Sequence, residues 1–148
     1  MPDHREQRLI RHAPGQVFDI VADIERYPEF LPWCIALRIR KRDAGQINAD
    51  MIIGFKVFRE KFTTNVSLDP PYRLDVEYLD GPFKYLNNHW IFNPMEEGGC
   101  EIDFFVDFEF KSMILQKAIG VVFNEAVQKM INAFEARAHK IYASQRNL

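Results

Sequence analysis

Apolar and polar side chains alternate in one segment after another between residues 35 and 110. The clearest case is residues 101–110, where every second side chain from Ile102 to Phe110 is apolar and most of the others are acidic. Because consecutive side chains of a strand point to opposite faces, this period of two predicts strands with one buried face. Similar segments span about residues 35–40, 47–57, 58–68, 73–78 and 86–92, with turn-forming residues between them. This succession predicts an antiparallel meander.

Helical periods flank the alternating region. Residues 7–12 suit a short first strand, and Pro14 begins an amphipathic helix that we expect to reach Ile24. Residues 112–143 repeat apolar side chains with a period of 3.6, which predicts a long C-terminal helix with a bend or break at Gly120. A helix of about 30 residues would reach roughly 45 Å, so it must lie across the sheet. We therefore predict one α+β domain over residues 1–148, with a curved antiparallel sheet wrapped around this helix.

The stretch YPEFLPWC, residues 27–34, concentrates large apolar side chains around two prolines. Pro28 and Pro32 argue against a long helix or a central strand there. Two interpretations stay open, because the aromatic rings either pack onto the protein's own core or contact a ligand or a membrane. The 13 phenylalanines of the chain pose the same question, since they suit an aromatic core as well as the wall of an apolar cavity.

Charge and cysteine content narrow the class of protein. The formal net charge of -2 gives no general attraction to DNA or to anionic lipid. The first residues are charged and lack the apolar run of a secretory signal, and no segment has the roughly 20 apolar residues of a membrane span. We therefore expect a cytoplasmic protein with at most peripheral contact to the inner membrane. Cys34 and Cys100 are expected to be free structural thiols.

Three motifs give the chain a family resemblance: YPEFLPWC at residues 27–34, GPFKYLNNHW at 81–90 and AFEARA at 133–138. With them the chain resembles bacterial-type members of the coenzyme Q-binding protein family. That family is a branch of the START-like superfamily, which also contains polyketide cyclases and lipid carriers. A family of ribosome-association toxins shares a weaker form of the first motif, and the Trp33-Cys34 pair together with Gly81-Pro82-Phe83 favours the quinone branch.

The resemblance implies a helix-grip fold and a function. The implied protein is a carrier or chaperone that binds ubiquinone or a related polyprenyl lipid in an apolar cavity, supports respiration and does not transform its ligand. It needs no further cofactor.

Periodicity predicts which side chains would line such a cavity. The inward faces of the strands and one stripe of the C-terminal helix would meet there, although a filled core of the same residues is the competing interpretation. The predicted wall consists of Met51, Ile53, Phe55, Phe62, Val66, Val76, Tyr78, Trp90, Phe104, Val106, Phe108, Val122, Phe123, Met130 and Phe134. Two connecting segments would form a portal over its mouth with Tyr27, Phe30, Leu31, Trp33, Phe83 and Tyr85.

The ionisable residues predict neither a catalytic nor a metal site. Glu60 is the best candidate acid or base, because the period of two places it among apolar residues; an ion pair or solvent contact is the alternative. The chain contains no dinucleotide or phosphate-binding motif. The four histidines are scattered without the spacing of metal ligands: His4, His12, His89 and His139.

Two other functions remain as alternatives. A ribosome-association factor would need a basic face, which the basic residues of segment 38–42 would provide if they lay beside Arg5, Arg8 and Arg11. Those residues of the segment are Arg38, Arg40, Lys41 and Arg42. A small cyclase-like enzyme would need polar groups that converge in the cavity, for which the sequence offers Glu60, Thr64 and Tyr78.

Overall fold

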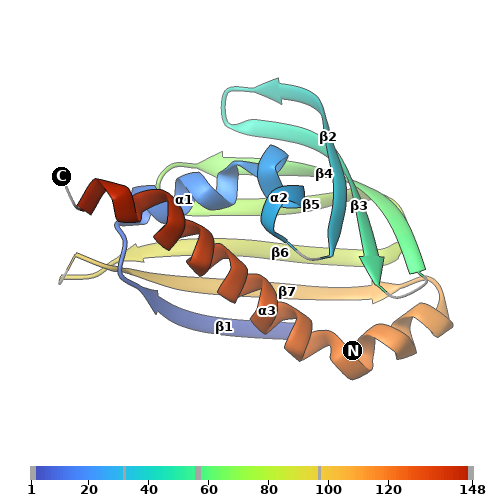
Figure 1. The fold of residues 1–148 in the computed structure, drawn as a ribbon. Helices are drawn as coiled ribbons and strands as arrows, with labels where there is room; N and C mark the ends of the chain where they lie inside the picture. Colours follow the sequence, from blue (N-terminus) through green and yellow to red (C-terminus); the bar gives the residue numbers. More distant parts are fainter. Residues whose placement is uncertain (1–2, 32, 56–57, 97, 147–148) are drawn as a thin grey trace.

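A seven-stranded sheet and one long helix dominate the computed structural model (Figure 1), which describes residues 3–31, 33–55, 58–96 and 98–146, without the side chains of Phe55 and of residues 143–146. In chain order the elements are β1 (Asp3–Ile10), α1 (Pro14–Ala22), the 3-10 helix η1 (Ile24–Arg26), α2 (Tyr27–Phe30), β2 (Cys34–Asp43), β3 (Gln46–Phe55), β4 (Phe58–Asp69), β5 (Arg73–Asp80), β6 (Phe83–Pro94), β7 (Cys100–Phe110) and α3 (Met113–Arg146).

The strands pair in the order β1-β7-β6-β5-β4-β3-β2, and every pair is antiparallel. Strands β2 to β7 form the predicted meander, and β1 joins it beside the last strand. The predicted α+β helix-grip architecture is confirmed. The element bounds differ slightly, since β1 begins before residue 7 and α1 ends before Ile24. Pro28 lies in the first turn of α2, where proline fits a helix start.

The two basic segments of the sequence lie at opposite edges of this sheet. Strand β1 is one edge and β2 is the other, so the prediction that the basic residues of segment 38–42 lie beside those of segment 5–11 is wrong. The reason is that β1 pairs with β7 and not with β2. Part of the β2 charge is also neutralised, because Arg40 Nε lies 2.8 Å from Asp50 Oδ2. No continuous basic face arises from these two segments.

Irregular pairing interrupts the described sheet at four places, two of which lie in β4 and β6 beside residues predicted for the cavity or its portal. The register shifts between Thr63 and Thr64 in β4 and between Phe83 and Tyr85 in β6. Such bulges increase the local twist and help a sheet to curl. Just before β6, Gly81 has φ +146°, and a Cβ there would lie 2.5 Å from Cβ of Phe62. Glycine at this position of the GPF motif therefore allows the turn to approach β4 closely.

Helix α3 runs across the side of the sheet that also carries α1 and α2 (Figure 1). It begins near the end of β7 and finishes beside α1, where the hydroxyl of Tyr142 donates to the carbonyl of Gln16 at 3.1 Å. The last turns of α3 are thereby tied to the first turns of α1.

Beneath α1 the apolar face of the sheet is filled. We call this region the solid end and define it by side chains of α1, α3 and the sheet that are almost completely buried. Phe92 is 0% exposed and meets the ring of Phe18 edge to face, with centroids 5.7 Å apart. The solid end comprises Ile10, Phe18, Val21, Phe92, Cys100, Ile102 and Ile131.

Candidate functional site

Beyond the solid end, the space between α3 and the sheet is hollow. It forms a cavity of about 300 Å³, at the lower end of the roughly 300–1,000 Å³ typical of small-molecule sites. We call this region the hollow end. Of the side chains that periodicity predicted for the wall, the structure places these on it: Met51, Ile53, Phe62, Val66, Val76, Trp90, Phe104, Val106, Phe108, Val122, Phe123, Met130 and Phe134.

Two residues of the predicted wall, Phe55 and Tyr78, are not among these wall residues. The side chain of Phe55 lies outside the described part of the chain. Tyr78 lies behind the wall, where its hydroxyl accepts the backbone N–H of Phe83 at 3.0 Å and its ring meets that of Phe83 edge to face. Tyr78 keeps the register of Val76, because it pairs with Thr64, so the physical reason is its packing against Phe83, which itself lines the cavity.

The predicted portal residues are mostly part of the wall. Tyr27, Leu31, Trp33 and Phe83 line the cavity, and all of them except Trp33 are buried. The YPEFLPWC stretch therefore packs largely onto the interior of the protein. The hydroxyl of Tyr27 donates to the carbonyl of Val21, which ties α2 to α1.

Phe30 and Tyr85 do not line the cavity. The Phe30 ring packs edge to face on Phe134, with the guanidinium carbon of Arg137 5.1 Å from its centroid. Tyr85 follows the register shift in β6 and has Asp107 and Glu109 as its charged neighbours. Tyr85 was predicted for the portal because residues 81–85 were expected to form a loop; instead β6 begins at Phe83, and alternation puts Tyr85 on the face opposite Leu86.

Several wall residues were not predicted from the sequence. Leu86 and Asn88 of β6 stand on the same face as Trp90, and Ile119 and Leu115 of α3 precede Val122 by about one and two helical turns. The period of two counted back from Trp90 would have identified the first pair. The period of 3.6 counted back from Val122 would have identified the second.

Only a few polar groups interrupt this apolar wall. Glu60 is half-buried and forms no ion pair with a described residue, whereas Thr64 is 6% exposed. Asn88 donates from Nδ2 to the carbonyl of Phe105 at 2.8 Å. The described wall contains no lysine, arginine or histidine. An anionic ligand would therefore find no counter-charge there, and a neutral one needs none.

Tyr27, which lines the cavity, and Cys34, which lies next to the wall, are both kept neutral. Burial raises the pKa of Tyr27 well above its usual value, with smaller contributions from Cys34 and Asp23. Burial also raises the pKa of Cys34 to about 11. A thiol with such a pKa is a poor nucleophile near neutral pH, because little of it is thiolate.

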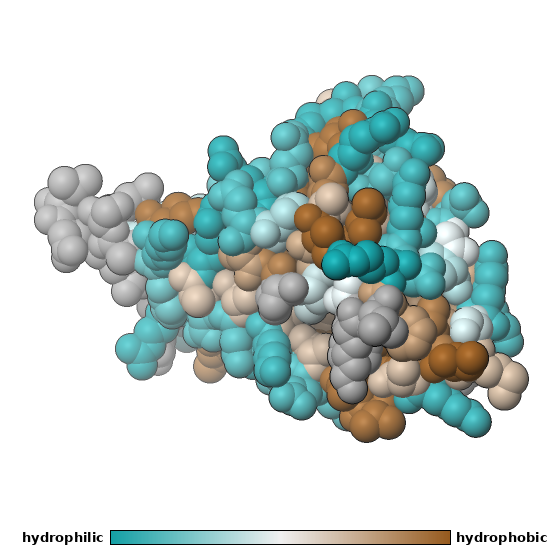
Figure 2. All heavy atoms as spheres, turned by 45° about the vertical axis from the view of Figure 1, so that its right-hand side comes forward, coloured by the Kyte–Doolittle hydropathy of each residue, from teal (hydrophilic) through white to brown (hydrophobic). Residues whose placement is uncertain are grey.

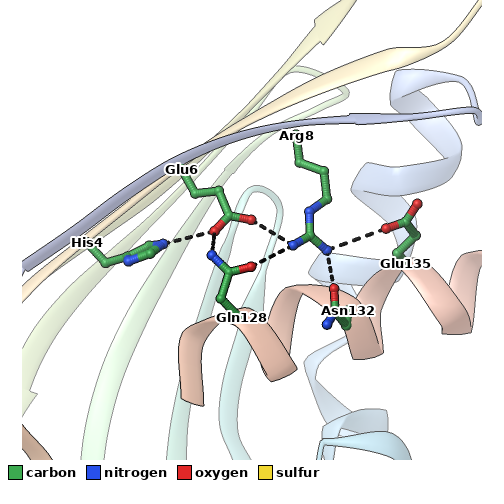
Figure 3. Close-up of polar contacts among 6 residues, drawn as sticks. All are labelled: His4, Glu6, Arg8, Gln128, Asn132 and Glu135. Carbon is green, nitrogen blue, oxygen red and sulfur yellow. Dashed lines mark hydrogen bonds and ion pairs between the residues drawn. The ribbon is translucent and has the colours of Figure 1, made fainter. Parts of the chain in front are cut away.

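The second half of α3 is fixed to β1 by a polar seam (Figure 3), which consists of Glu6 and Arg8 of β1 and Gln128, Asn132 and Glu135 of α3. The Arg8 guanidinium donates to Gln128 Oε1 at 2.9 Å and lies 2.9 Å from the Glu6 carboxylate. Arg8 also donates to Asn132 at 2.5 Å and pairs with Glu135 at 3.4 Å. These contacts hold α3 over the sheet without filling the space beneath its first half.

The first turns of α3 expose large apolar side chains instead. Met113 is 75% exposed, Ile114 is 71% exposed and Val121 is 86% exposed. Figure 2 brings this end of the molecule forward and shows hydrophobic groups on the surface among hydrophilic ones. Lys111 and Lys117 are also exposed here, and residues 111–122 contain no acidic side chain.

The described part of the chain offers neither a metal site nor a membrane-spanning helix. No three histidine, cysteine or carboxylate side chains of the described residues come together as a metal-binding group. None of the helices in that part of the chain is both long and apolar enough to cross a membrane.

Comparison with known proteins adds a family match. The model of the family described as polyketide cyclase/dehydrase and lipid transport matches residues 10–135. The ribosome association toxin RatA of Rickettsia prowazekii is 37% identical over 145 residues, which cover 95% of this chain and 99% of the toxin. The mitochondrial coenzyme Q-binding protein COQ10 homolog B of Xenopus laevis is 33% identical over 147 residues, which cover 97% of this chain and 60% of that protein.

A solved structure supports the fold. The START superfamily protein from Mycobacterium smegmatis superposes with a TM-score of 0.79 over 94% of this chain and 98% of its own. At 16% identity this likeness concerns the fold alone.

Proposed function

The chain belongs to the polyketide cyclase/dehydrase and lipid transport family, and from this membership we propose that it binds one neutral apolar lipid in the cavity under α3 and does not transform it. The observation that carries the proposal is the wall itself, which is apolar on nearly all sides and lacks a cation among its described residues. At about 25 cal/mol per Å² of buried apolar surface, a tail that buries a few hundred Å² gains on the order of 5–10 kcal/mol before ordering is counted.

Within this class we propose ubiquinone or a related polyprenyl lipid as the ligand, with the protein as its carrier or chaperone in respiration. The motifs shared with the coenzyme Q-binding family and the similarity to the Xenopus laevis protein support this choice. A long polyprenyl tail exceeds a cavity of about 300 Å³, so part of it would leave through the hollow end.

We propose that lipid enters from a membrane surface beside the first turns of α3. The exposed Met113, Ile114 and Val121 would contact the acyl region, and Lys111 and Lys117 the headgroups. Replacing all three apolar residues by glutamine should slow uptake of lipid from vesicles and leave affinity for a short-tailed ligand in solution unchanged. Uptake at the normal rate would eliminate this entry route.

The test of the main proposal is identification of the bound ligand. Protein purified from a quinone-producing bacterium would be examined by native mass spectrometry, then extracted with organic solvent. We expect one polyprenyl lipid per chain, with the mass of the unmodified cellular lipid. Val122→Glu places a charge on the wall and should give ligand-free protein. A wild-type protein that is empty and takes up no added lipid would refute the proposal.

Ribosome association is the second candidate, and sequence similarity favours it over quinone binding. The Rickettsia prowazekii toxin has the higher identity of the two relatives and is matched over almost its whole length. The surface offers less support, because the basic segments lie on opposite edges of the sheet. Sedimentation of purified ribosomal subunits with the protein tests this function. Co-sedimentation with a subunit and loss of joined ribosomes would support it, and free protein at the top of the gradient would exclude it.

A further inference from the structure

Two polar atoms of the cavity wall, the Thr64 hydroxyl and Asn88 Oδ1, have no hydrogen-bond partner among the described residues. Thr64 is 94% buried, and its hydroxyl forms no hydrogen bond with a described residue. Asn88 uses Nδ2 for the carbonyl of Phe105, but its Oδ1 has no partner among the described residues. Buried polar atoms are normally hydrogen-bonded, because leaving one unpaired is unfavourable. Neither atom is enclosed by the protein itself, since Asp103 Oδ1 is the one fully buried polar side-chain atom of the described residues without a partner, so both atoms are open to whatever fills the cavity. A ligand that displaces water from them must offer matching polar groups.

The orientation of the Asn88 amide follows from its known partner. A backbone carbonyl only accepts hydrogen bonds, so the group that meets the Phe105 carbonyl must be the NH₂ group of the amide. The group that remains for a ligand is Oδ1, which only accepts. Thr64 is less selective, because its hydroxyl both donates and accepts.

The two groups lie near enough to serve one ligand. Asn88 pairs with Val76 of β5, and Val76 pairs with Val66 of β4, which is two residues from Thr64 on the same face. Thr64 and Asn88 are thus two strands apart and offset by two residues along the strand, or roughly 12 Å between backbones, and both line the cavity inside the curl of the sheet. A six-membered ring with oxygens at opposite ends, joined by hydrogen bonds of about 2.8 Å, fits between them.

We propose that Thr64 and Asn88 form a headgroup site for an uncharged, hydroxyl-bearing ring, so that the cavity binds the hydroquinone form of a lipid more tightly than its quinone form. The inference rests on the proposed lipid-binding function and specifies its ligand. A hydroquinone hydroxyl donates to Asn88 Oδ1, and its opposite oxygen pairs with the Thr64 hydroxyl. A quinone offers only acceptors, which Thr64 can satisfy and Asn88 Oδ1 cannot.

The same wall discriminates against charged lipids. A fatty-acid carboxylate would meet the acceptor of Asn88 and the carboxyl of Glu60, with no cation on the described wall to compensate. The favoured ligand is therefore a neutral phenol or hydroquinone with an apolar tail.

Calorimetric titration under anaerobic conditions tests the inference with three probes of equal tail length: an alkyl hydroquinone, the corresponding quinone and the hydroquinone dimethyl ether. We expect the hydroquinone to bind about tenfold more tightly than the other two, because each of them leaves Asn88 Oδ1 unpaired. Equal affinity for all three would overturn the headgroup site and leave apolar binding intact. Failure of all three to bind would instead refute the proposed function.

Single substitutions show which side chain causes the preference for hydroquinone over quinone. Asn88→Leu removes the acceptor and should abolish the preference for hydroquinone while the dimethyl ether still binds. Asn87→Leu makes the same change at the neighbouring exposed position of β6 and should leave the preference unchanged. Because Asn88→Leu also removes the hydrogen bond to Phe105, the near-isosteric Thr64→Val serves as an independent variant and should weaken hydroquinone and quinone binding alike. A full preference for hydroquinone in Asn88→Leu, or unchanged affinity for both forms in Thr64→Val, would contradict the assignment.

Discussion

The solid end and the hollow end share the same sheet and the same long helix, yet only one of them is filled. At the solid end, α1 inserts Phe18 and Val21 between α3 and the strands, where they pack with Phe92. At the hollow end η1 and α2 line the cavity with Ile24, Tyr27 and Leu31 but do not fill it, and strand side chains face α3 across about 300 Å³. The difference indicates that the cavity arises from an incomplete third layer, and not from unusually small side chains.

The two ends also differ in how α3 is held. Its second half has the polar seam to β1 and the hydrogen bond of Tyr142 to α1, whereas its first turns expose Met113 and Ile114. Local opening is expected where buried contacts are fewest, which is the hollow end.

The largest expected effect on the free energy of unfolding comes from a phenylalanine-to-alanine substitution, which we compare at the two ends. Phe92→Ala at the solid end should lower the free energy of unfolding by about 3–5 kcal/mol, because it leaves a void in a closely packed region. Phe108→Ala should lower it by roughly half as much, because Phe108 already borders empty space. Chemical denaturation of the two variants measures both values. Equal losses would show that the two ends are packed alike.

The next effect concerns the seam. Arg8→Ala leaves the partly buried Glu6 and Glu135 without their cation and should lower the free energy of unfolding by about 1–3 kcal/mol. The control is Arg5→Ala on the same strand, whose guanidinium lies over the Phe105 ring and should contribute only about 0.5–1 kcal/mol. Thermal unfolding of both variants compares them. If Arg8→Ala is as stable as Arg5→Ala or more stable, the seam does not anchor α3.

Filling the cavity should change the free energy of unfolding only slightly but should weaken lipid binding strongly. Val106→Phe adds volume where the wall borders the cavity, so the ligand-free protein should stay within about 1.5 kcal/mol of the wild type. Lipid affinity should fall at least tenfold because the ligand and the new ring compete for one space. Normal affinity in a folded Val106→Phe variant would place the ligand elsewhere.

The smallest effect is a difference in thiol reactivity. Burial raises the pKa of both Cys34 and Cys100 to about 11, so both are protonated thiols at pH 8 and react slowly with alkylating reagents. Cys34 pairs with Ile53 at the hollow end, whereas Cys100 belongs to the solid end. Cys34 should therefore react faster in the native protein, and mass spectrometry of the labelled peptides measures the ratio. Faster labelling of Cys100 would reverse the proposed order of local stability.

Strict alternation and helical period were sufficient to predict the fold and many of the side chains that face the interior, but not whether that interior is filled. Residues such as Phe104, Phe108 and Met130 follow a regular period, and the structure places them where that period predicts. Tyr78 has the predicted register but packs on Phe83, a contact that a periodic pattern does not reveal. Tyr85 was misplaced because β6 begins at Phe83, where a loop was expected. The separation of the basic segments depended on β1 pairing with β7, a contact between distant parts of the chain. Asn88 was missed, although alternation places it on the face of Trp90, because the wall was predicted from apolar and aromatic side chains.

The most direct test of the central claim uses the two tryptophans of the chain, Trp33 and Trp90, which both line the cavity. A short-tailed polyprenyl hydroquinone would be titrated anaerobically into wild-type and Val106→Phe protein while tryptophan fluorescence is recorded. Binding at the hollow end predicts a saturable change at one ligand per chain in the wild type and none in the filled variant. An unchanged wild-type signal, or the same titration curve in both proteins, would contradict the account.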